Sequence, residues 1–222
     1  MVCPECLSRL HLDTYKSAHG EILSGNLSCN KGHTFTIVDG IPRMATSFGE
    51  SEQVKESFSS KWTMFEDVAF SKRDMEFQFN WYISRYGFRD SEGLRKLVRS
   101  KTNILDVGCG VGRAVGWFSD FADKQTIIGI DMSDAINVAY RRYGAKPNVH
   151  FVQGDILKPP FRKGTFDYIS CDQVIHHIQS PEEAFNRQVE LLAKGGQLSV
   201  YAYRKKGPIR EFCDDYIRAK TT

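Results

Sequence analysis

The stretch Ile104-Leu105-Asp106-Val107-Gly108-Cys109-Gly110-Val111-Gly112-Arg113 decides the fold of this chain. An apolar run that leads into three alternate glycines indicates a buried strand, a tight turn and a helix, because glycine lets a ligand lie against the backbone. A second apolar run ends at Gly129-Ile130-Asp131, and Asp131 lies 19 residues after Gly112. A carboxylate at that spacing can accept hydrogen bonds from both hydroxyls of a ribose. Together, these features predict a nucleoside-containing ligand at one edge of a parallel sheet.

Two other interpretations of the glycine loop are a turn that holds no ligand and a site for a nicotinamide or flavin dinucleotide. The dinucleotide pattern G-x-G-x-x-G places a pyrophosphate at a helix N-terminus. Here the glycines fall at positions 108, 110 and 112, and Arg113 follows them. Asp106 would bring a negative charge close to phosphates, whereas it suits a ligand that carries an ammonium and a sulfonium. The residues therefore favour a positively charged sulfur nucleoside.

The sequence around this loop predicts an α/β fold, a Rossmann-like and mostly parallel sheet with flanking helices. Strand-like and helical stretches alternate from residue 102 to residue 205, which is typical of such sheets. The predicted strands are Asn103–Val107, Thr126–Ile130, Val149–Gln153, Phe166–Cys171 and Gln197–Tyr203. Helices are expected near 112–122, 133–142 and 181–193. Ser180 is expected to cap the last of these, and Lys194-Gly195-Gly196 to end it.

Four motifs in this region resemble those of the seven-stranded, Rossmann-like S-adenosylmethionine-dependent methyltransferases. They are the glycine loop 106–112, Gln153-Gly154-Asp155-Ile156, the segment 166–178 with its His-His pair, and the segment 191–198. The resemblance implies that Asp106 faces the methionyl end of the cofactor, Asp131 the ribose, and Asp155 with Ile156 the adenine. The implied cofactor-binding residues are Asp106, Gly108, Cys109, Gly110, Gly112, Asp131, Met132, Gly154, Asp155, Ile156 and Cys171.

The segment after the fourth predicted strand contains the candidate catalytic residues His176, His177 and Asp172. Methyl transfer from a sulfonium mainly needs alignment and desolvation of the reactants, and a base only where the acceptor must lose a proton. The pKa of histidine lies near neutrality, so either histidine could be that base. The alternatives are that the histidines shape the pocket or cap the next helix, and that Asp172 is a turn or capping residue.

The N-terminal 33 residues contain a second pattern, Cys3-x2-Cys6 followed by Cys29-x3-His33. Three thiolates and one imidazole suit tetrahedral zinc, and four protein ligands leave no place for a reactive water, so we predict a structural Zn²⁺. A redox Cys-x-x-Cys pair and unrelated thiols are the alternatives. His11 or His19 could replace His33 as the fourth ligand.

This front segment resembles two kinds of zinc module. The Cys-x-x-Cys and Cys-x3-His-x-Phe patterns are similar to the N-terminal module of bacterial ribosomal-RNA guanine-N1 methyltransferases. The stretch Asp39-Gly40-Ile41-Pro42-Arg43-Met44 is closer to small zinc-binding proteins that activate methyltransferases. Because this stretch departs from the ribosomal enzymes, it weakens the interpretation of RNA as the substrate.

Between the two patterns lies a polar segment with ten aromatic residues at positions 58–88. Phe58, Trp62 and Phe65 fall on one helical face, which predicts either a helix packed on the sheet or a lid over an apolar acceptor pocket. The charges in this segment are mixed, which is not typical of an RNA groove. We therefore predict three parts: a zinc-ribbon-like module at 1–44, a helical aromatic linker or lid at 45–100, and the cofactor-binding domain at 101–222.

The composition of the 222 residues fits a globular chain without a strong charge bias. Lys plus Arg number 30 and Asp plus Glu 27, which gives a net charge of +3. No apolar run approaches the ~20 residues of a membrane helix. The first residues lack the basic and apolar stretches of a signal peptide, so we predict a cytoplasmic location and no membrane partner.

The C-terminal part leaves no room after about Arg204 for the last two strands of a seven-stranded sheet. The fold is therefore expected to lack them, and its fifth strand to offer an open edge through which a homo-oligomer could form. We predict an S-adenosylmethionine-dependent methyltransferase that acts on a small molecule. An RNA methyltransferase of the ribosomal guanine-N1 type and a non-catalytic, cofactor-binding regulatory protein are the alternatives.

Overall fold

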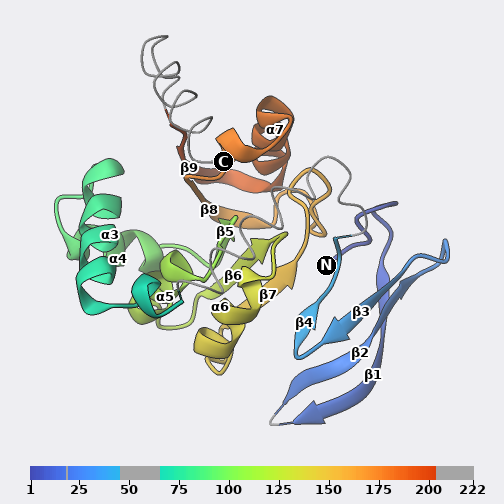
Figure 1. The fold of residues 1–222 in the computed structure, drawn as a ribbon. Coiled ribbons are helices and arrows are strands. Elements are labelled where there is room, and N and C mark those ends of the chain that lie inside the picture. The colour runs from blue at the N-terminus through green and yellow to red at the C-terminus, as the bar shows by residue number, and fades with distance from the viewer. Residues whose placement is uncertain (19, 46–65, 204–222) are drawn as a thin grey trace, which may run out of the picture.

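The computed structural model describes residues 1–18, 20–45 and 66–203, which form two sheets (Figure 1). Within these residues, an antiparallel sheet of four strands comes first, and a parallel sheet of five strands comes after three helices. The two sheets and the helices confirm the predicted fold class.

The parallel sheet has the strand order β7-β6-β5-β8-β9, and every neighbouring pair is parallel. Its strands are β5 (Asn103–Val107), β6 (Thr126–Asp131), β7 (Val149–Gln153), β8 (Phe166–Asp172) and β9 (Leu192–Tyr201). Chain order reverses beside β5, and ligands of such sheets bind at that point, outside the carboxyl ends of the strands. β9 begins at Leu192, earlier than the predicted start at Gln197. Its register with β8 shifts between Leu192 and Gln197, and Gly195 in this irregular stretch has a φ of +77°.

Three helices follow strands of the parallel sheet, close to the predicted positions: α5 (Arg113–Phe121), α6 (Ala135–Tyr143) and α7 (Pro181–Leu191). A 3-10 turn, η2 (Ile175–His177), follows β8. Ser180 occupies the N-cap position of α7 as predicted, but its side chain makes no capping hydrogen bond. The start of α7 therefore relies on Pro181 in its first turn and on the acidic residues that follow.

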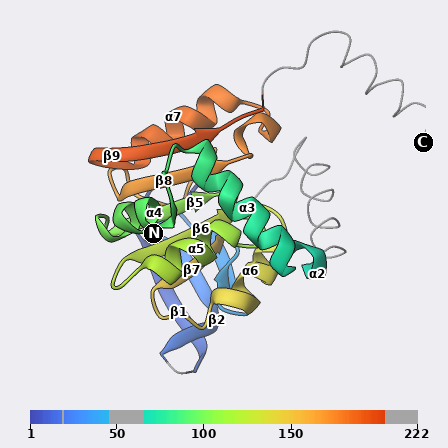
Figure 2. The same ribbon diagram turned by 90° about the vertical axis from the view of Figure 1, so that its left-hand side faces the viewer.

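The described part of the predicted linker is helical: α2 (Glu66–Ala69), α3 (Lys72–Arg85) and α4 (Ser91–Arg99). Figure 2 shows α3 crossing in front of the parallel sheet. Tyr82 of α3 is 1% exposed, and its hydroxyl lies 3.1 Å from the Tyr168 hydroxyl and 3.2 Å from Ser170 Oγ. This contact fixes α3 on β8. The predicted face of Phe58, Trp62 and Phe65 lies outside the described residues.

The N-terminal sheet has the strands β1 (Leu10–Ala18), β2 (Glu21–Cys29), β3 (Thr34–Val38) and β4 (Ile41–Pro42) in that order. The turn between β3 and β4 has positive φ at Asp39 (50°) and Gly40 (77°), as is typical of an Asp-Gly pair in a two-residue hairpin. The sequence gives little sign of β1, because nearly all of its residues are exposed.

This N-terminal sheet docks on the β7 edge of the parallel sheet (Figure 1). Arg43 and Gln153 form a parallel β-bridge, and one apolar core includes Leu27 and Phe35 from the first sheet together with Ile156 after β7. The two sheets therefore share a core. The boundaries at residues 44 and 100 stay predictions.

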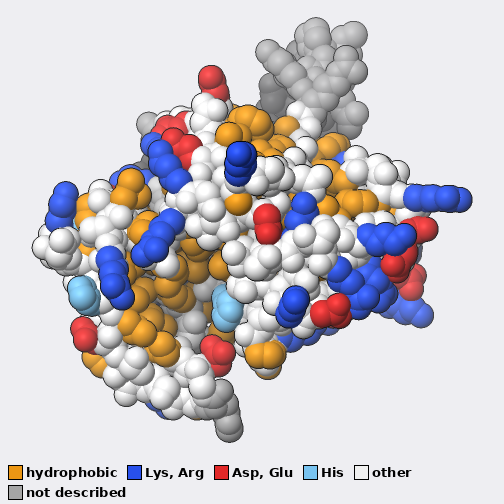
Figure 3. All heavy atoms as spheres, turned by 180° about the vertical axis from the view of Figure 1, so that it is seen from behind, with side chains coloured by type: hydrophobic (Ala, Val, Ile, Leu, Met, Phe, Trp, Pro, Cys, Tyr) orange, Lys and Arg blue, Asp and Glu red, His pale blue; other side chains and the backbone are white. Residues whose placement is uncertain are grey.

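At the opposite edge, β9 pairs with β8, and pairing of this edge with a second chain stays a prediction. Among the described residues, none of the helices combines the length and the apolar character that a membrane crossing requires. On the face drawn in Figure 3, Lys and Arg side chains are spread among acidic, neutral and apolar ones.

Candidate functional site

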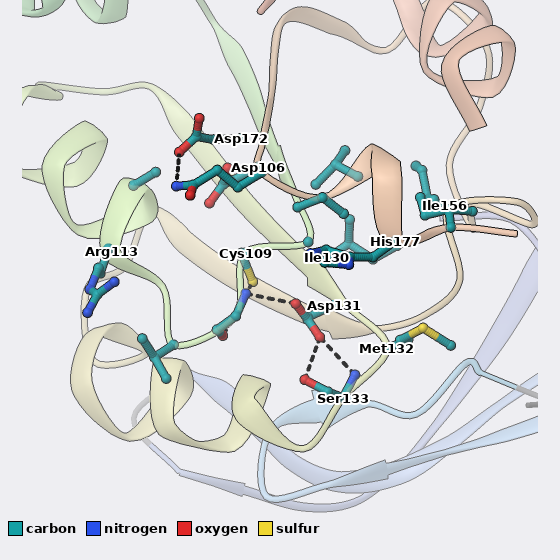
Figure 4. Close-up of a pocket in the computed structure, with 18 of the residues that line it drawn as sticks. Asp106, Cys109, Arg113, Ile130, Asp131, Met132, Ser133, Ile156, Asp172 and His177 are labelled. Atoms are coloured by element: carbon teal, nitrogen blue, oxygen red, sulfur yellow. Dashed lines mark hydrogen bonds between the residues drawn. The ribbon is translucent and has the colours of Figure 1, made fainter. Parts of the chain in front are cut away.

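A pocket of about 500 Å³ lies at the carboxyl ends of β5, β6, β7 and β8 (Figure 4). Its volume falls in the range of small-molecule and cofactor sites. Most of the residues predicted from the sequence line it: Asp106, Gly108, Cys109, Gly110, Asp131, Met132, Gly154, Asp155, Ile156, Asp172 and His177. The predicted set, which extends from Asp106 to His177 in the chain, is thus largely brought together at one place.

The glycine loop takes a backbone conformation that side chains rarely allow. Gly108, Gly110 and Gly112 have φ values of 65°, 51° and 83°. A Cβ on Gly108 would lie 2.4 Å from Val174 Cγ2, and one on Gly112 would lie 2.9 Å from Ala139 Cβ. Glycine is therefore required at 108 by the packing of the loop after β8, and at 112 by the packing of α5 on α6.

Asp131 at the end of β6 is hydrogen-bonded to the glycine loop. Its Oδ2 accepts from Gly110 N at 2.8 Å, and its Oδ1 accepts from Ser133 N at 2.8 Å and from Ser133 Oγ at 2.7 Å (Figure 4). Burial raises the pKa of this carboxyl, and the hydrogen bonds oppose that rise. A carboxylate has about four acceptor positions, so Asp131 can still accept from a ligand hydroxyl.

Asp106 near the end of β5 is a buried acid, with 3% of its surface exposed. Burial raises its pKa well above the ordinary value, the charge of Asp172 raises it further, and a hydrogen bond with Ser170 opposes the shift. A cation in the pocket would favour the ionised form. This end of the pocket is therefore suited to a positively charged ligand group.

The segment after β7 forms another wall of the pocket, with Gly154, Asp155, Ile156 and Leu157. Asp155 Oδ1 accepts a hydrogen bond from Leu157 N at 2.8 Å, which shapes this turn. Gly154 N donates to Asp131 O at 3.0 Å, so the ends of β6 and β7 are held together. Ile156 is 7% exposed and contributes an apolar surface.

Asp172 at the end of β8 is held by three donors. Its Oδ1 pairs with Arg85 Nη1 and accepts from the Tyr86 hydroxyl at 3.0 Å, and its Oδ2 accepts from Gln173 Nε2 at 3.1 Å. Arg85 in turn lies between the rings of Trp81 and Tyr201, at 3.9 and 4.0 Å from their centroids. Asp172 therefore connects α3 to the pocket as a paired carboxylate.

The two candidate histidines occupy different places. His177 lines the pocket (Figure 4). His176 is not among the lining residues: its ring lies 4.1 Å from the rings of both His177 and Tyr203. Burial and the neighbouring His177 lower the pKa of His176. The geometry thus favours His177 over His176 as the residue that faces a ligand.

Two other predicted residues, Gly112 and Cys171, also do not line the pocket. Cys171 is completely buried in the core, and burial raises the pKa of its thiol to about 12. Pocket residues that the sequence prediction did not name include Gln78, Arg113, Trp117, Ser133, Gln173 and Tyr203. Ser133 could have been inferred from its place two residues after Asp131. Gln78 and Trp117 come from α3 and α5, and no local motif marks them.

The predicted metal ligands Cys3, Cys6, Cys29 and His33 lie together at one end of the N-terminal sheet. One ligand atom from each falls within 4.8 Å of all the others. Cys6 Sγ lies 3.7 Å from Cys29 Sγ, and His33 Nδ1 lies 3.3 Å from Cys29 Sγ. A tetrahedron with zinc–sulfur bonds of about 2.3 Å has edges of about 3.8 Å, so these spacings fit zinc.

His11 and His19 were the alternatives to His33 as the fourth ligand. His11 lies on β1 beside Ser28 and does not belong to the cluster, and His19 lies outside the described residues. Burial raises the pKa of Cys29, but the hydrogen bonds from the backbone of Lys31 and His33 and from the side chains of His33 and Cys6 together lower it to about 6. A thiol that ionises easily is a ready metal ligand.

Comparison with known proteins matches residues 105–200 to the family model described as a methyltransferase domain. A sterol 24-C-methyltransferase of Schizosaccharomyces pombe is 29% identical over 110 residues, which are 48% of this chain and 29% of that protein. Phosphoethanolamine N-methyltransferase 3 of Arabidopsis thaliana is 33% identical over 113 residues, which are 49% of this chain and 23% of that protein. The match thus spans less than a third of either relative.

Among solved structures, the PH0226 protein of Pyrococcus horikoshii OT3 resembles this chain with a TM-score of 0.50 and 22% identity. The similarity covers 69% of this chain and 65% of that one. At this identity the likeness shows a shared fold.

Proposed function

We propose that this chain, whose residues 105–200 form a class I S-adenosylmethionine-dependent methyltransferase domain, binds S-adenosylmethionine in the pocket and transfers its methyl group to a small molecule. The observation that carries the proposal is the set of three acids at the ends of neighbouring parallel strands: Asp106, Asp131 and Asp155 surround one pocket beside a glycine loop. That arrangement suits a nucleoside with a positively charged end.

Each side of the pocket fits one part of this cofactor. Asp131 would accept from the ribose hydroxyls, since its oxygens have free acceptor positions after bonding Gly110 and Ser133. Ile156 would pack on the adenine and Asp155 would face its amino group. Asp106 would favour the positively charged methionyl end, because a cation there offsets the cost of ionising a buried acid.

The cofactor supplies a methyl group on a sulfonium, which is an excellent leaving group, so the protein's work is alignment and exclusion of water. Trp117, Gln78 and Tyr203 line the pocket together with His177 and would surround the acceptor. His177 is the candidate base where the acceptor must lose a proton. Asp172, which is paired with Arg85, would position α3 against this side.

The acceptor is proposed to be a small molecule on two grounds. The pocket of about 500 Å³ has a size suited to small ligands. The names of the related proteins assign them to sterol and phosphoethanolamine substrates. The scattered basic side chains of Figure 3 do not favour an RNA groove on that face.

We also propose that Cys3, Cys6, Cys29 and His33 bind one structural Zn²⁺. The support is the mutual distance of their ligand atoms, all within 4.8 Å, and the chemistry of three sulfurs and one imidazole. Four protein ligands would close the coordination sphere, so the ion would hold the Cys3–Cys6 turn against the β2–β3 hairpin.

Calorimetry with S-adenosylmethionine, S-adenosylhomocysteine and NAD tests the cofactor. Binding of the first two without NAD is expected, and binding of NAD alone would contradict the proposal. Methyl transfer from isotope-labelled S-adenosylmethionine to a metabolite extract and to total RNA then tests the acceptor. Label only in RNA would support the RNA alternative, and tight cofactor binding without any transfer would support the regulatory one.

A further inference from the structure

Gln153, the last residue of β7, links the N-terminal sheet to the cofactor pocket. It is buried, with 7% of its surface exposed. Its Oε1 accepts from Arg43 Nη1 at 3.1 Å, and its Nε2 donates to Met132 O at 3.3 Å and to Asp134 Oδ1 at 3.0 Å. Gly154, which lines the pocket, follows it directly. Both the oxygen and the nitrogen of the Gln153 amide are thus hydrogen-bonded, which fixes the orientation of the amide.

The Arg43 side chain spans three elements. Besides Gln153, it donates through Nη2 to Asn137 Oδ1 at 2.7 Å and to Val38 O at 3.4 Å. These partners lie on α6, which follows the segment 131–134, and on β3 of the N-terminal sheet. A planar guanidinium with donors in a fixed fork is suited to hold such partners in one arrangement.

The backbone strengthens the same connection. Met44 N donates to Gln153 O at 2.7 Å, and Arg43 pairs with Gln153 across the β-bridge. The N-terminal sheet therefore covers the edge of β7, which would otherwise present unpaired backbone groups. The part of β7 that it covers is the end at which the pocket begins.

A second contact reaches the other pocket segment, the loop after Ile156. Val2 N donates to Pro160 O at 2.9 Å, and Lys158 Nζ lies 3.1 Å from Glu5 Oε2. Cys3 and Ile156 belong to one apolar core. Both segments that the proposed function assigns to the adenosine end are therefore in contact with residues 1–44, which include the N-terminal sheet.

We infer that Arg43 is a positioning residue for the cofactor, which acts through Gln153 on the segment 131–134, and that the N-terminal sheet is thereby part of the cofactor-binding machinery. The inference rests on the proposed binding of S-adenosylmethionine in the pocket. Without Arg43, the Gln153 amide loses one of the three side-chain hydrogen bonds that fix its orientation. Binding must then include the ordering of Met132 and its neighbours, which costs affinity.

A double-mutant cycle in affinity for S-adenosylhomocysteine tests this inference, with R43A, Q153M and the double variant measured by calorimetry on the full chain. We expect R43A to weaken binding about tenfold and Q153M at least as much. Because Arg43 acts through Gln153, adding R43A to Q153M should change affinity less than about twofold. R99A is the matched control, since Arg99 makes comparable bonds to Phe121 O and Asp123 outside the pocket lining.

Three further measurements separate positioning from loss of fold or metal. The R43A variant should keep the metal content of the wild type and a cooperative thermal transition. R43K keeps the positive charge but lacks the planar guanidinium with its several donors. Its affinity should therefore lie between those of R43A and the wild type. If R43A does not fold, R43K and Q153M form the same cycle.

Wild-type affinity in R43A, or losses that add in the double variant, would overturn the inference. A wild-type chain that does not bind S-adenosylhomocysteine at all would instead contradict the proposed function.

Discussion

The two sheets of this chain are covered to very different extents. In the parallel sheet, four consecutive residues of β5 are buried, so both faces of that strand are covered. In the N-terminal sheet, Phe35 and Ile37 of β3 are buried and alternate with exposed neighbours, and nearly all of β1 is exposed. The parallel sheet can thus be stabilised by burial, whereas the N-terminal sheet has a thin core.

The difference shows what the N-terminal sheet requires. A sheet with one covered face and few buried residues needs another source of stability, such as a metal or a docking surface. This sheet has a candidate for both: the Cys/His cluster at one end, and the β7 edge beside β4. The second of these also lies next to the pocket, because Gln153 directly precedes Gly154, which lines it.

The largest difference in stability between the two sheets is expected when the Cys/His cluster loses a ligand. C29S removes one thiolate, and the N-terminal sheet should lose its metal and its resistance to proteolysis, because a structural zinc site supplies folding free energy. The parallel sheet should remain folded. Metal analysis and limited proteolysis with mass spectrometry measure both outcomes.

C171A is the matched control for that variant, because Cys171 is a buried thiol outside the cluster. It should keep the metal. A C29S chain that holds its metal and resists proteolysis at residues 1–44 would contradict the zinc proposal.

A second variant tests the parallel sheet instead. In G108A, the new Cβ would lie 2.4 Å from Val174 Cγ2 at a residue with φ of 65°. The loop must shift, and affinity for S-adenosylhomocysteine should fall about 30-fold, in line with overpacking costs of ~2 kcal/mol. G87A is the control: Gly87 also has a positive φ, 71°, but a Cβ there meets nothing within 4 Å. Equal affinity in both variants would refute the requirement for glycine at position 108.

A third variant separates function from stability within the pocket. D106N should weaken S-adenosylmethionine binding about tenfold, because the charge that favours the cationic end is lost. The raised pKa of Asp106 means that the folded chain holds a proton that the unfolded chain releases. Its contribution to stability therefore falls as pH rises from the ordinary aspartate value towards the raised one.

Asparagine cannot ionise, so it avoids the free-energy cost of a buried acid at pH values above the ordinary aspartate pKa. The ligand-free D106N chain should therefore unfold at a higher temperature than the wild type, by more at pH 8 than at pH 5. Thermal unfolding at the two pH values measures this. The same pH dependence in both chains would show that Asp106 is already ionised without a ligand.

The smallest effect is expected from Y82F in α3. The variant removes a hydroxyl that bonds Tyr168 and Ser170 in the core, and the free energy of unfolding should fall by about 1 kcal/mol. Urea unfolding measures it, and Y15F, which changes a tyrosine that is 67% exposed, should change stability much less. Equal stabilities would mean that the contact of α3 with β8 rests on packing alone.

Local patterns were enough to predict much of the site. The strands Asn103–Val107 and Val149–Gln153 have the predicted bounds, because short, mostly apolar runs that are followed directly by glycine leave few alternatives. The Cys/His cluster was predictable because the spacing of metal-ligating residue types is a local property. β1 was not, since an exposed strand with bulges carries no apolar periodicity.

The sequence by itself determined the glycine loop, the acids that follow the strands and the Cys/His ligands, since each depends on residue type and short spacing. Only the tertiary structure decided that His177 rather than His176 faces the pocket, that Arg85 pairs with Asp172, and that Arg43 reaches Gln153. The last two pairs lie 87 and 110 residues apart in the chain. No local pattern encodes such contacts, because they arise where packed elements meet.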